Sequence, residues 1–508
     1  MSYSIYLALA AATAGHNNNP QKPVATAPDL ADALQPAWHG IRDLVERFRG
    51  NPVSPLTSTQ FENDLQGAVR ELARLTAQWT YNHLEPADVA ALPLAVRFHS
   101  STFRRLRHKT PQQVSTLFGP ITLRRLGYRA APMAGEPVVF PLCQQLGIVH
   151  GATPAVLDCV GRYQATTGAT QQHTLQRLRA AHGLYWGVKR LRQVTDFLAE
   201  VMQPHRQEAQ AERVLAWLAQ AQASRGRHRP VLSVGRDGIT LGLRVKKGTV
   251  YEVASTATLS VYDRKGRRVG TVYLAYPPEA GQATMGKQLT ALVQEVLRRW
   301  HGPLPRLSYV TDAGKSETAY YRGVLRRMRH PLTGERLDWQ WVVDYYHASL
   351  RVWTMAETLF GKGPKSYAWA RKMQKVLLRE GGVGRLLHSA AALRSRYKLK
   401  GKRLKEFRRA YRYVQKRRQH MRYAQYRRLG VPIGSGVTEA ACKTVYTQRL
   451  KLSGMRWQKA GAQTVLTLRV ILLSGVWSQV FAQALNGFAM VTVRAPGQQG
   501  PLEARKRA

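Results

Sequence analysis

The stretch PVLSVGRDGITLGL, residues 230–243, contains a short run of β-branched and apolar residues that leads to Asp237. The stretch RLSYVTDAGKSE, residues 306–317, repeats this arrangement and places Asp312 directly after its apolar run. Runs of this length and composition predict β-strands. Glu439 follows a Gly-Ser-Gly turn and opens a helical pattern. We therefore expect three carboxylates at the ends of three secondary-structure elements.

Strand and helix patterns alternate around the two aspartates. Two more strand patterns, YEVASTATLSVYD and RVGTVYLAYPP, follow the first and predict a three-stranded meander. A helical pattern around 286–300, the strand before Asp312, a helical pattern around 318–328 and the strand-like DWQWVVDYYHA come next. This order is typical of an RNase H-like α/β domain, whose first and fourth strands are neighbours. Asp237 and Asp312, 75 positions apart (312 minus 237), would then meet in space.

The expected fold class is α/β, with the RNase H-like domain interrupted by an all-α insertion. Its first part would cover residues 230–350 and its second part residues 431–487. Residues 351–430 between them read as helical, and residues 361–430 contain 23 lysines and arginines against two acids. Tyrosines interleave with these charges, as on a surface that follows a phosphate backbone, and the bias disfavours a merely solvated face. The expected DNA contacts of the insertion are Arg408, Arg409, Arg417 and Arg418.

The whole chain is strongly basic, with 77 lysines and arginines against 30 acids, a net charge of +47 and a pI near 10.9. This charge implies a polyanionic partner, and double-stranded DNA is favoured over a membrane because no lipidation signal is present. Three separated cysteines without a CxxC pair fit a reducing cytoplasm. The opening apolar stretch lacks the basic flank of a secretory signal, and the apolar stretch 464–485 carries Arg469, so we expect no membrane span.

Upstream of the α/β domain, the sequence predicts a mainly helical N-terminal region that binds DNA. Residues 26–110 carry two helical patterns, and residues 111–150 a small β element. Three short helical patterns in residues 151–222, joined by Gly-containing turns, resemble a helix-turn-helix. A purely structural three-helix unit is an equally supported alternative. The tails, residues 1–25 and 488–508, are predicted to be disordered.

Three carboxylates at element ends suit a site for two metal ions that act on a phosphodiester. Oxygen ligands favour Mg²⁺ or Mn²⁺, and we expect two ions per site with Asp237 as the bridge between them. The competing third ligand is Glu317, five residues past Asp312. Glu295 and Glu357 read as solvent-exposed helix residues.

The order RDG, TDAGK, DYYH, a long helical stretch and GSGVTEAACK with QRLKLSGMRW resembles the DDE transposases of bacterial insertion sequences, in the broad Mutator-like group. The resemblance covers about residues 230–487, and the GSG-x-x-E block with the downstream basic helix and Trp is its most specific part. It implies that Asp237, Asp312 and Glu439 are the catalytic residues and metal ligands.

Asp344 and His347 match the D-x-x-H signature that supports the active site in this family. From the residues alone, the two lie three positions apart at a strand-to-helix junction, where a carboxylate can orient an imidazole. Relatives often carry a zinc-binding element upstream, and this chain has no cysteine pair for one.

The resemblance implies metal-dependent cleavage at transposon ends and transfer of the 3′ hydroxyl into target DNA. Two ends must be held together, so we expect a homo-oligomer on DNA, at the nucleoid in a bacterial cytoplasm. Two alternatives stay open: an RNase H-like nuclease or resolvase that cuts without joining, and a non-catalytic DNA-binding protein derived from a transposase. Further DNA contacts are expected downstream of Glu439, with core packing of the tryptophan equally open: Lys443, Arg449, Lys451, Arg456 and Trp457.

Overall fold

The computed structural model describes residues 29–98, 101–130 and 138–488, which form a mixed α/β protein with helices at its N-terminus. The predicted tails lie outside these residues, apart from Phe488, which ends the last helix.

Five strands form the larger sheet in the order β7-β6-β5-β8-β9. Three of them form the antiparallel meander that the sequence predicts: β5 (Val231–Val245), β6 (Gly248–Tyr262) and β7 (Arg268–Tyr276). The other two run parallel to β5: β8 (Arg306–Thr311) and β9 (Trp339–Val343). The predicted pairing of the first and fourth strands is confirmed, because β5 and β8 are hydrogen-bonded neighbours.

Helices cover both faces of this sheet. β5 is buried from Val231 to Arg236 without alternation, as expected for a strand with apolar partners on each side. The helices that connect β7 to β8 and β8 to β9 are η2 (Ala280–Gln282), α8 (Ala283–Arg299), α9 (Lys315–Gly323) and η3 (Leu325–Arg327). One face of α8 is apolar at helical spacing, with Met285, Leu289 and Val293 buried in the main core.

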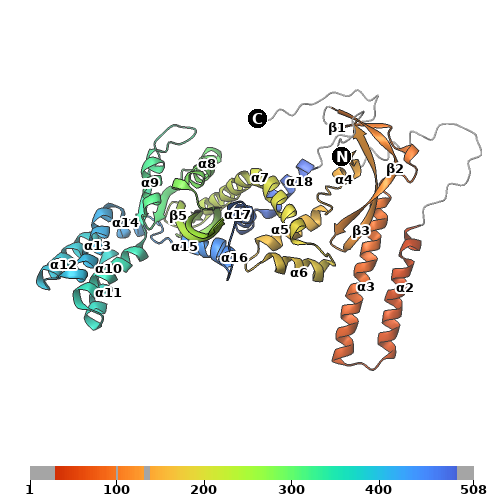
Figure 1. Ribbon diagram of the computed structural model, residues 1–508. Helices are drawn as coiled ribbons and strands as arrows, with labels where there is room; N and C mark the ends of the chain where they lie inside the picture. Colours follow the sequence, from red (N-terminus) through yellow and green to blue (C-terminus); the bar gives the residue numbers. More distant parts are fainter. Residues whose placement is uncertain (1–28, 99–100, 131–137, 489–508) are drawn as a thin grey trace, which may run out of the picture.

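The insertion is helical throughout, as predicted, and lies at one end of the molecule (Figure 1). Its helices are α10 (Tyr345–Phe360), α11 (Pro364–Leu377), α12 (Gly382–Arg396), α13 (Gly401–Arg417), η4 (Arg418–His420) and α14 (Tyr423–Arg428). Phe407 and Val414 belong to the same apolar core as the sheet. The hydroxyl of Tyr423 donates to the Val343 carbonyl, so α14 satisfies part of the outer edge of β9.

The chain then returns to the sheet through five short or apolar helices. They are α15 (Gly436–Ala441), the π-helix η5 (Cys442–Thr447), α16 (Gln448–Leu450), α17 (Lys459–Leu473) and α18 (Trp477–Phe488). The apolar stretch 464–485 is divided between α17 and α18. Gly475 adopts φ 69° and ends the first helix there, because a left-handed residue cannot continue a right-handed helix.

The N-terminal part combines a helical hairpin with a second sheet. The hairpin consists of α2 (Leu30–Gly50) and α3 (Pro55–Asn82), and it projects beyond the rest of the molecule (Figure 1). After η1 (Val89–Ala91), the sheet has the order β1-β2-β3-β4 with β1 (Ala95–Phe98), β2 (Ser101–Thr116), β3 (Gly119–Ala130) and β4 (Val138–Val139). Strands therefore begin at Ala95, inside residues 26–110, which were expected to be helical. Basic residues of β2 interrupt the apolar alternation that would have revealed it.

Three helices fill residues 151–222, but the third is not short. After α4 (Pro141–Gln145) come α5 (Pro154–Ala165), α6 (Gln171–His182) and α7 (Val188–Ala223). α7 is 36 residues long and continues through Pro204, because its apolar positions pack against two cores. One core holds the sheet, and the other holds α5, α6, α17 and α18. Residues 151–222 thus share their packing with the C-terminal helices.

No helix within the described ranges has both the length and the apolar character needed to cross a membrane.

The pH dependence of stability can be predicted from His420. Its ring packs on Trp341 with centroids 4.2 Å apart. Burial, together with the positive charges of Arg322 and Arg422, lowers the pKa of His420 from 6.5 to about 4. The folded state prefers the neutral imidazole, so the unfolded chain takes up a proton at higher pH. We expect the stabilising contribution to be complete above about pH 6.5 and to be lost as the pH falls towards 4.

The measurement is the thermal unfolding midpoint of His420→Gln and wild type between about pH 7 and pH 4.5. The midpoint of His420→Gln should fall less steeply with decreasing pH than the midpoint of wild type. His39→Gln, which alters an exposed histidine of α2, is the control and should follow wild type. If the midpoint of His420→Gln fell as steeply as that of wild type, the lowered pKa of His420 would not be the cause of the pH dependence.

Candidate active site

Asp237 and Asp312 lie on neighbouring strands of the larger sheet. Asp312 directly follows β8, as expected. Asp237 lies in the middle of β5, so its predicted place at a strand end is wrong. The pairing of β5 with β8 nevertheless ends at Gly235, so Asp237 lies two residues beyond the last β5 residue that pairs with β8. The apolar run before Asp237 marks the part of β5 that is buried on both faces. It does not mark the end of the strand, which continues to Val245.

The third carboxylate, Glu439, lies in the first turn of α15, as predicted. The Ser435 hydroxyl donates a hydrogen bond to Glu439 Oε1 at 2.9 Å. α15 is held on the sheet by the Thr438 and Thr258 hydroxyls, 2.8 Å apart. A Cβ on Gly235 would lie 1.9 Å from the Thr438 hydroxyl, so β5 must have a glycine where α15 crosses it.

The three carboxylates affect one another electrostatically. Burial is the main cause that raises the pKa of Asp237, and the negative charges of Asp312 and Glu439 raise it further. Cys442, in the π-helix η5, lies with its thiol 3.4 Å from Asp237 Oδ2. Within the described residues, no lysine or arginine forms an ion pair with any of the three. The site therefore concentrates negative charge in a strongly basic protein.

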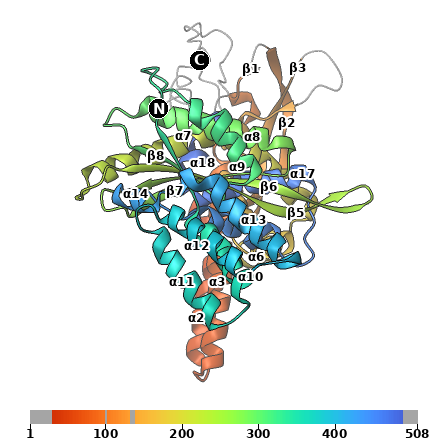
Figure 2. The same cartoon turned by 90° about the vertical axis from the view of Figure 1, so that its left-hand side faces the viewer.

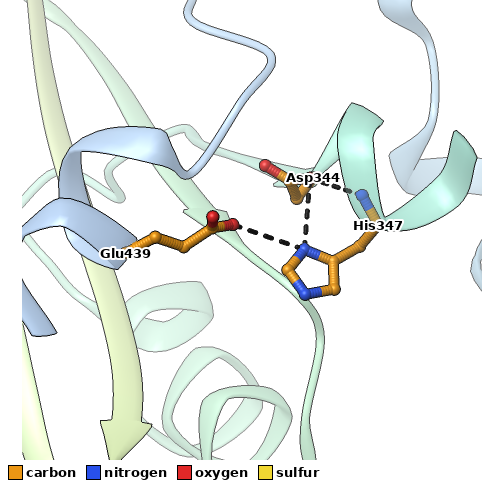
Figure 3. A group of neighbouring side chains, drawn as sticks. All are labelled: Asp344, His347 and Glu439. Atoms are coloured by element: carbon orange, nitrogen blue, oxygen red, sulfur yellow. Dashed lines mark hydrogen bonds and ion pairs between the residues drawn. The ribbon is translucent and has the colours of Figure 1, made fainter. Parts of the chain in front are cut away.

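Asp344 and His347 stand beside Glu439 (Figure 3). Asp344 is fully buried and caps α10 by accepting from the His347 backbone N–H at 2.7 Å. It also accepts from the Ser435 N–H. His347 Nδ1 lies 3.3 Å from Asp344 Oδ1 and 3.5 Å from Glu439 Oε1. The expectation that this carboxylate orients the imidazole is confirmed, and the supporting role of the pair stays a prediction.

The charges of this pair are mutually stabilising. Burial raises the pKa of Asp344, but hydrogen bonds from His347 and Ser435 outweigh it and lower the pKa overall. The hydrogen bond to Asp344 is the main cause that raises the pKa of His347, against the effect of burial. A protonated His347 can therefore hold Glu439 through an ion pair, while Asp344 holds His347.

The donor atoms at the site are mainly carboxylate oxygens, which fit a hard divalent cation. Within the described residues, one group of candidate ligand atoms lies within 4.8 Å of one another: those of Asp344, His347 and Glu439. It contains only one of the three expected ligands. Asp344 already accepts from two backbone N–H groups, so its oxygens are largely committed. Asp237, Asp312 and Glu439 also accept hydrogen bonds, but unlike fully buried Asp344 they are partly exposed.

The competing acids occupy different environments. Glu317 is buried on α9 beside the Asp312 loop, and burial is the main cause that raises its pKa. Glu295 is bound by Arg298 at 2.8 Å. Glu357 is exposed on α10. Only Glu317 therefore stays close enough to Asp312 to affect the site.

The Asp312 loop is also held by the insertion. The Tyr413 hydroxyl donates to the Asp312 carbonyl at 2.7 Å, and Arg417 donates to the Ala313 carbonyl at 2.8 Å. The Arg417 guanidinium lies 4.2 Å from the centre of the Tyr413 ring. Arg417 is half-exposed and part of its guanidinium holds this loop, so a structural role competes with its expected DNA contact. The sequence showed only an interleaved tyrosine and arginine and no sign of their partner.

Two more expected DNA contacts are structural. Arg449 is 1% exposed and donates to the Gln164 carbonyl at 2.8 Å, so it is not available to DNA. Trp457 is half-buried, and its indole N–H donates to the Leu450 carbonyl at 2.8 Å. Its backbone also pairs with β5 next to Leu243, which favours the packing alternative. The other six expected contacts are exposed: Lys443, Lys451, Arg456, Arg408, Arg409 and Arg418.

No family model matches the chain, and no curated protein shows significant sequence similarity to it.

Gly235→Ala should separate α15 from β5. The added methyl group would meet the Thr438 hydroxyl at 1.9 Å and the Thr258 hydroxyl at 2.8 Å. We expect a loss of about 1–3 kcal/mol in the free energy of unfolding, typical of overpacking, seen as a lower thermal midpoint. Gly242→Ala, on the same strand, is the matched control, because its nearest contact would be an ordinary 3.4 Å to Tyr251. Equal thermal midpoints for the two variants would contradict the close packing of Thr438 on Gly235.

Proposed function

We propose that the protein is a DDE-type transposase with an RNase H-like catalytic domain. The observation that carries the proposal is the arrangement of Asp237, Asp312 and Glu439. They come from three distant parts of the sequence, and the charges of Asp312 and Glu439 add to the effect of burial, the main cause that raises the pKa of Asp237. The sheet order β7-β6-β5-β8-β9, with a meander followed by two parallel strands, supports the RNase H-like assignment.

In the proposed reaction, Asp237, Asp312 and Glu439 would hold two Mg²⁺ or Mn²⁺ ions. When bound, such ions lower the pKa of an attacking water and stabilise the charge that develops on the leaving oxygen. The protein supplies the positions of the ligands. Ser435 and His347 orient Glu439 through Oε1, and Cys442 contacts Asp237. Water first attacks the phosphodiester at the transposon end, and the freed 3′ hydroxyl then attacks target DNA.

The insertion is the proposed surface for the DNA backbone. Arg408, Arg409 and Arg418 are exposed on α13 and η4, and the same helix contacts the Asp312 loop through Tyr413. Phosphates bound to the exposed side of α13 would therefore lie on an element that is fixed to the active site. Cleavage at two ends requires two active sites held together, so the proposed assembly on DNA is a homo-oligomer.

The two alternatives differ from a transposase in their products. A nuclease or resolvase would cut without joining, and a non-catalytic relative would bind DNA and do neither. A strand-transfer assay with pre-cleaved ends separates the three, because only a transposase forms the joined product.

Glu439→Gln should abolish both cleavage and strand joining. The substitution keeps the side-chain size but removes the charge that would hold a metal ion and pair with His347. We expect at least about a 100-fold loss of rate with Mg²⁺ or Mn²⁺, with DNA affinity retained. Glu357→Gln, on the exposed side of α10, is the charge-matched control and should cleave normally. Near-normal cleavage by Glu439→Gln would move the third ligand to Glu317.

The triple substitution of Arg408, Arg409 and Arg418 by Gln should weaken DNA binding regardless of sequence. Fewer counterions would be released, so the logarithm of affinity should depend less steeply on the logarithm of salt concentration, by up to about 0.9 per lost phosphate contact. Arg417→Gln is the comparison, because its guanidinium is held by Ala313. It should slow cleavage and leave the salt slope unchanged. A triple variant with the slope of wild type would place the phosphate contacts elsewhere.

A further inference from the structure

A polar cavity of about 720 Å³ lies at the outer edge of the larger sheet, beside the start of β9. The catalytic carboxylates follow β8 or lie on β5 and α15, and none of them lines this cavity. Its walls come from β9, from the end of α9 with η3, and from η4 with α14. The volume lies within the range of sites for small molecules.

The cavity carries an excess of positive charge. Three arginines line it, Arg322, Arg326 and Arg422, against a single acid, Asp338. Within the described residues, none of the three arginines forms an ion pair. Arginine side chains without carboxylate partners on one concave wall are suited to bind phosphate, which accepts paired hydrogen bonds from a guanidinium.

Aromatic rings form another part of the wall. Trp341 lies against Tyr321 with ring centroids 4.6 Å apart and against His420 at 4.2 Å. We call these three residues the ring cluster. The pKa of His420 is lowered mainly by burial and also by Arg322 and Arg422, so the ring is neutral and both arginines lie near it. Trp341 itself is 4% exposed, so the half-exposed rings of Tyr321 and His420 form the aromatic part of the wall, next to the phosphate-binding arginines.

Two buried polar atoms of the wall have no hydrogen-bond partner. Trp339 is 4% exposed and its indole N–H is unpaired, and the side-chain carbonyl oxygen of Gln340 is buried and unpaired. A buried donor or acceptor without a partner costs free energy unless a bound molecule satisfies it. Trp339 and Gln340 both line the cavity, so a small shift of either side chain would turn one donor or one acceptor towards the edge of a nucleobase, which carries both kinds of group.

We propose that this cavity binds a nucleotide, with its phosphate on the three arginines and its base beside the ring cluster. A simple anion would use the arginines and leave the rings and the two unpaired atoms without a role. A free nucleotide and an unpaired nucleotide of a DNA strand offer the same chemistry. The inference does not depend on the proposed transposase activity, since no group of the catalytic site takes part.

The test is calorimetric titration of the full chain without divalent metal. The probes are ATP, inorganic triphosphate and a short single-stranded oligonucleotide of thymidines. The variant Arg322→Gln/Arg422→Gln removes two exposed arginines of the cavity. The matched control, Arg47→Gln/Arg49→Gln, removes the same charge from the exposed end of α2. Thermal unfolding verifies that each is folded, and Arg422→Gln alone serves if the double variant is not.

We expect the cavity variant to bind at least about tenfold more weakly than the control variant. If the cavity variant loses affinity for ATP, the site binds a free nucleotide. If it loses affinity only for the oligonucleotide, the site binds an unpaired nucleotide of a strand. Equal affinities of the two variants for both probes would overturn the proposal. Inorganic triphosphate that binds as tightly as ATP would overturn it as well, because the base would contribute nothing. Cleavage is not measured, so failure of the transposase proposal leaves this result intact.

Discussion

The candidate site depends on the close approach of α15 to β5. Gly235 leaves room for the Thr438 hydroxyl, which shares a hydrogen bond with Thr258 on the next strand. The packing of α15 on β5 brings Glu439 towards Asp237, although the two residues are more than 200 positions apart in sequence (439 minus 237). Cys442, the first residue of the π-helix that follows α15, contacts Asp237 from the same segment. A side chain at position 235 would disturb all of these contacts together.

The helical insertion is built into the same structure and not merely attached to it. Tyr413 and Arg417 hold the backbone of the Asp312 loop, while Tyr423 satisfies a carbonyl at the edge of β9. In Figure 2 the helices α10, α12 and α13 lie below the strands of the sheet. The arginines on the exposed side of α13 therefore share a helix with residues that hold the Asp312 loop. If DNA binds there, the phosphate backbone and the carboxylates are held at a defined distance by one rigid element.

Local patterns predicted the elements of this fold better than its contacts. The meander, the pairing of the first and fourth strands and the helical insertion followed from periodicity and the order of elements. The strand β2 and the full length of α7 did not, because tertiary packing decides whether a charged strand forms and whether a helix continues through Pro204. The three carboxylates were found from their positions after apolar runs and a glycine turn. The contacts of Arg417 and Arg449 with protein carbonyls were not, since an arginine that donates to the protein and a free surface arginine look alike in sequence.

The distribution of charge explains why acids can gather in so basic a chain. The surplus of lysines and arginines lies largely on the insertion and other exposed helices, while the carboxylates of the site have no lysine or arginine partner among the described residues. Their mutual repulsion is offset locally by one imidazole, His347, which is itself fixed by buried Asp344. Repulsion that is only partly offset favours binding of a cation, because the cation removes it. The basic surface would act over a longer range and attract a polyanion towards the same region. In the proposed function the two kinds of charge would serve different steps: the arginines would bring phosphates near, and the carboxylates would bind the ions that act on them.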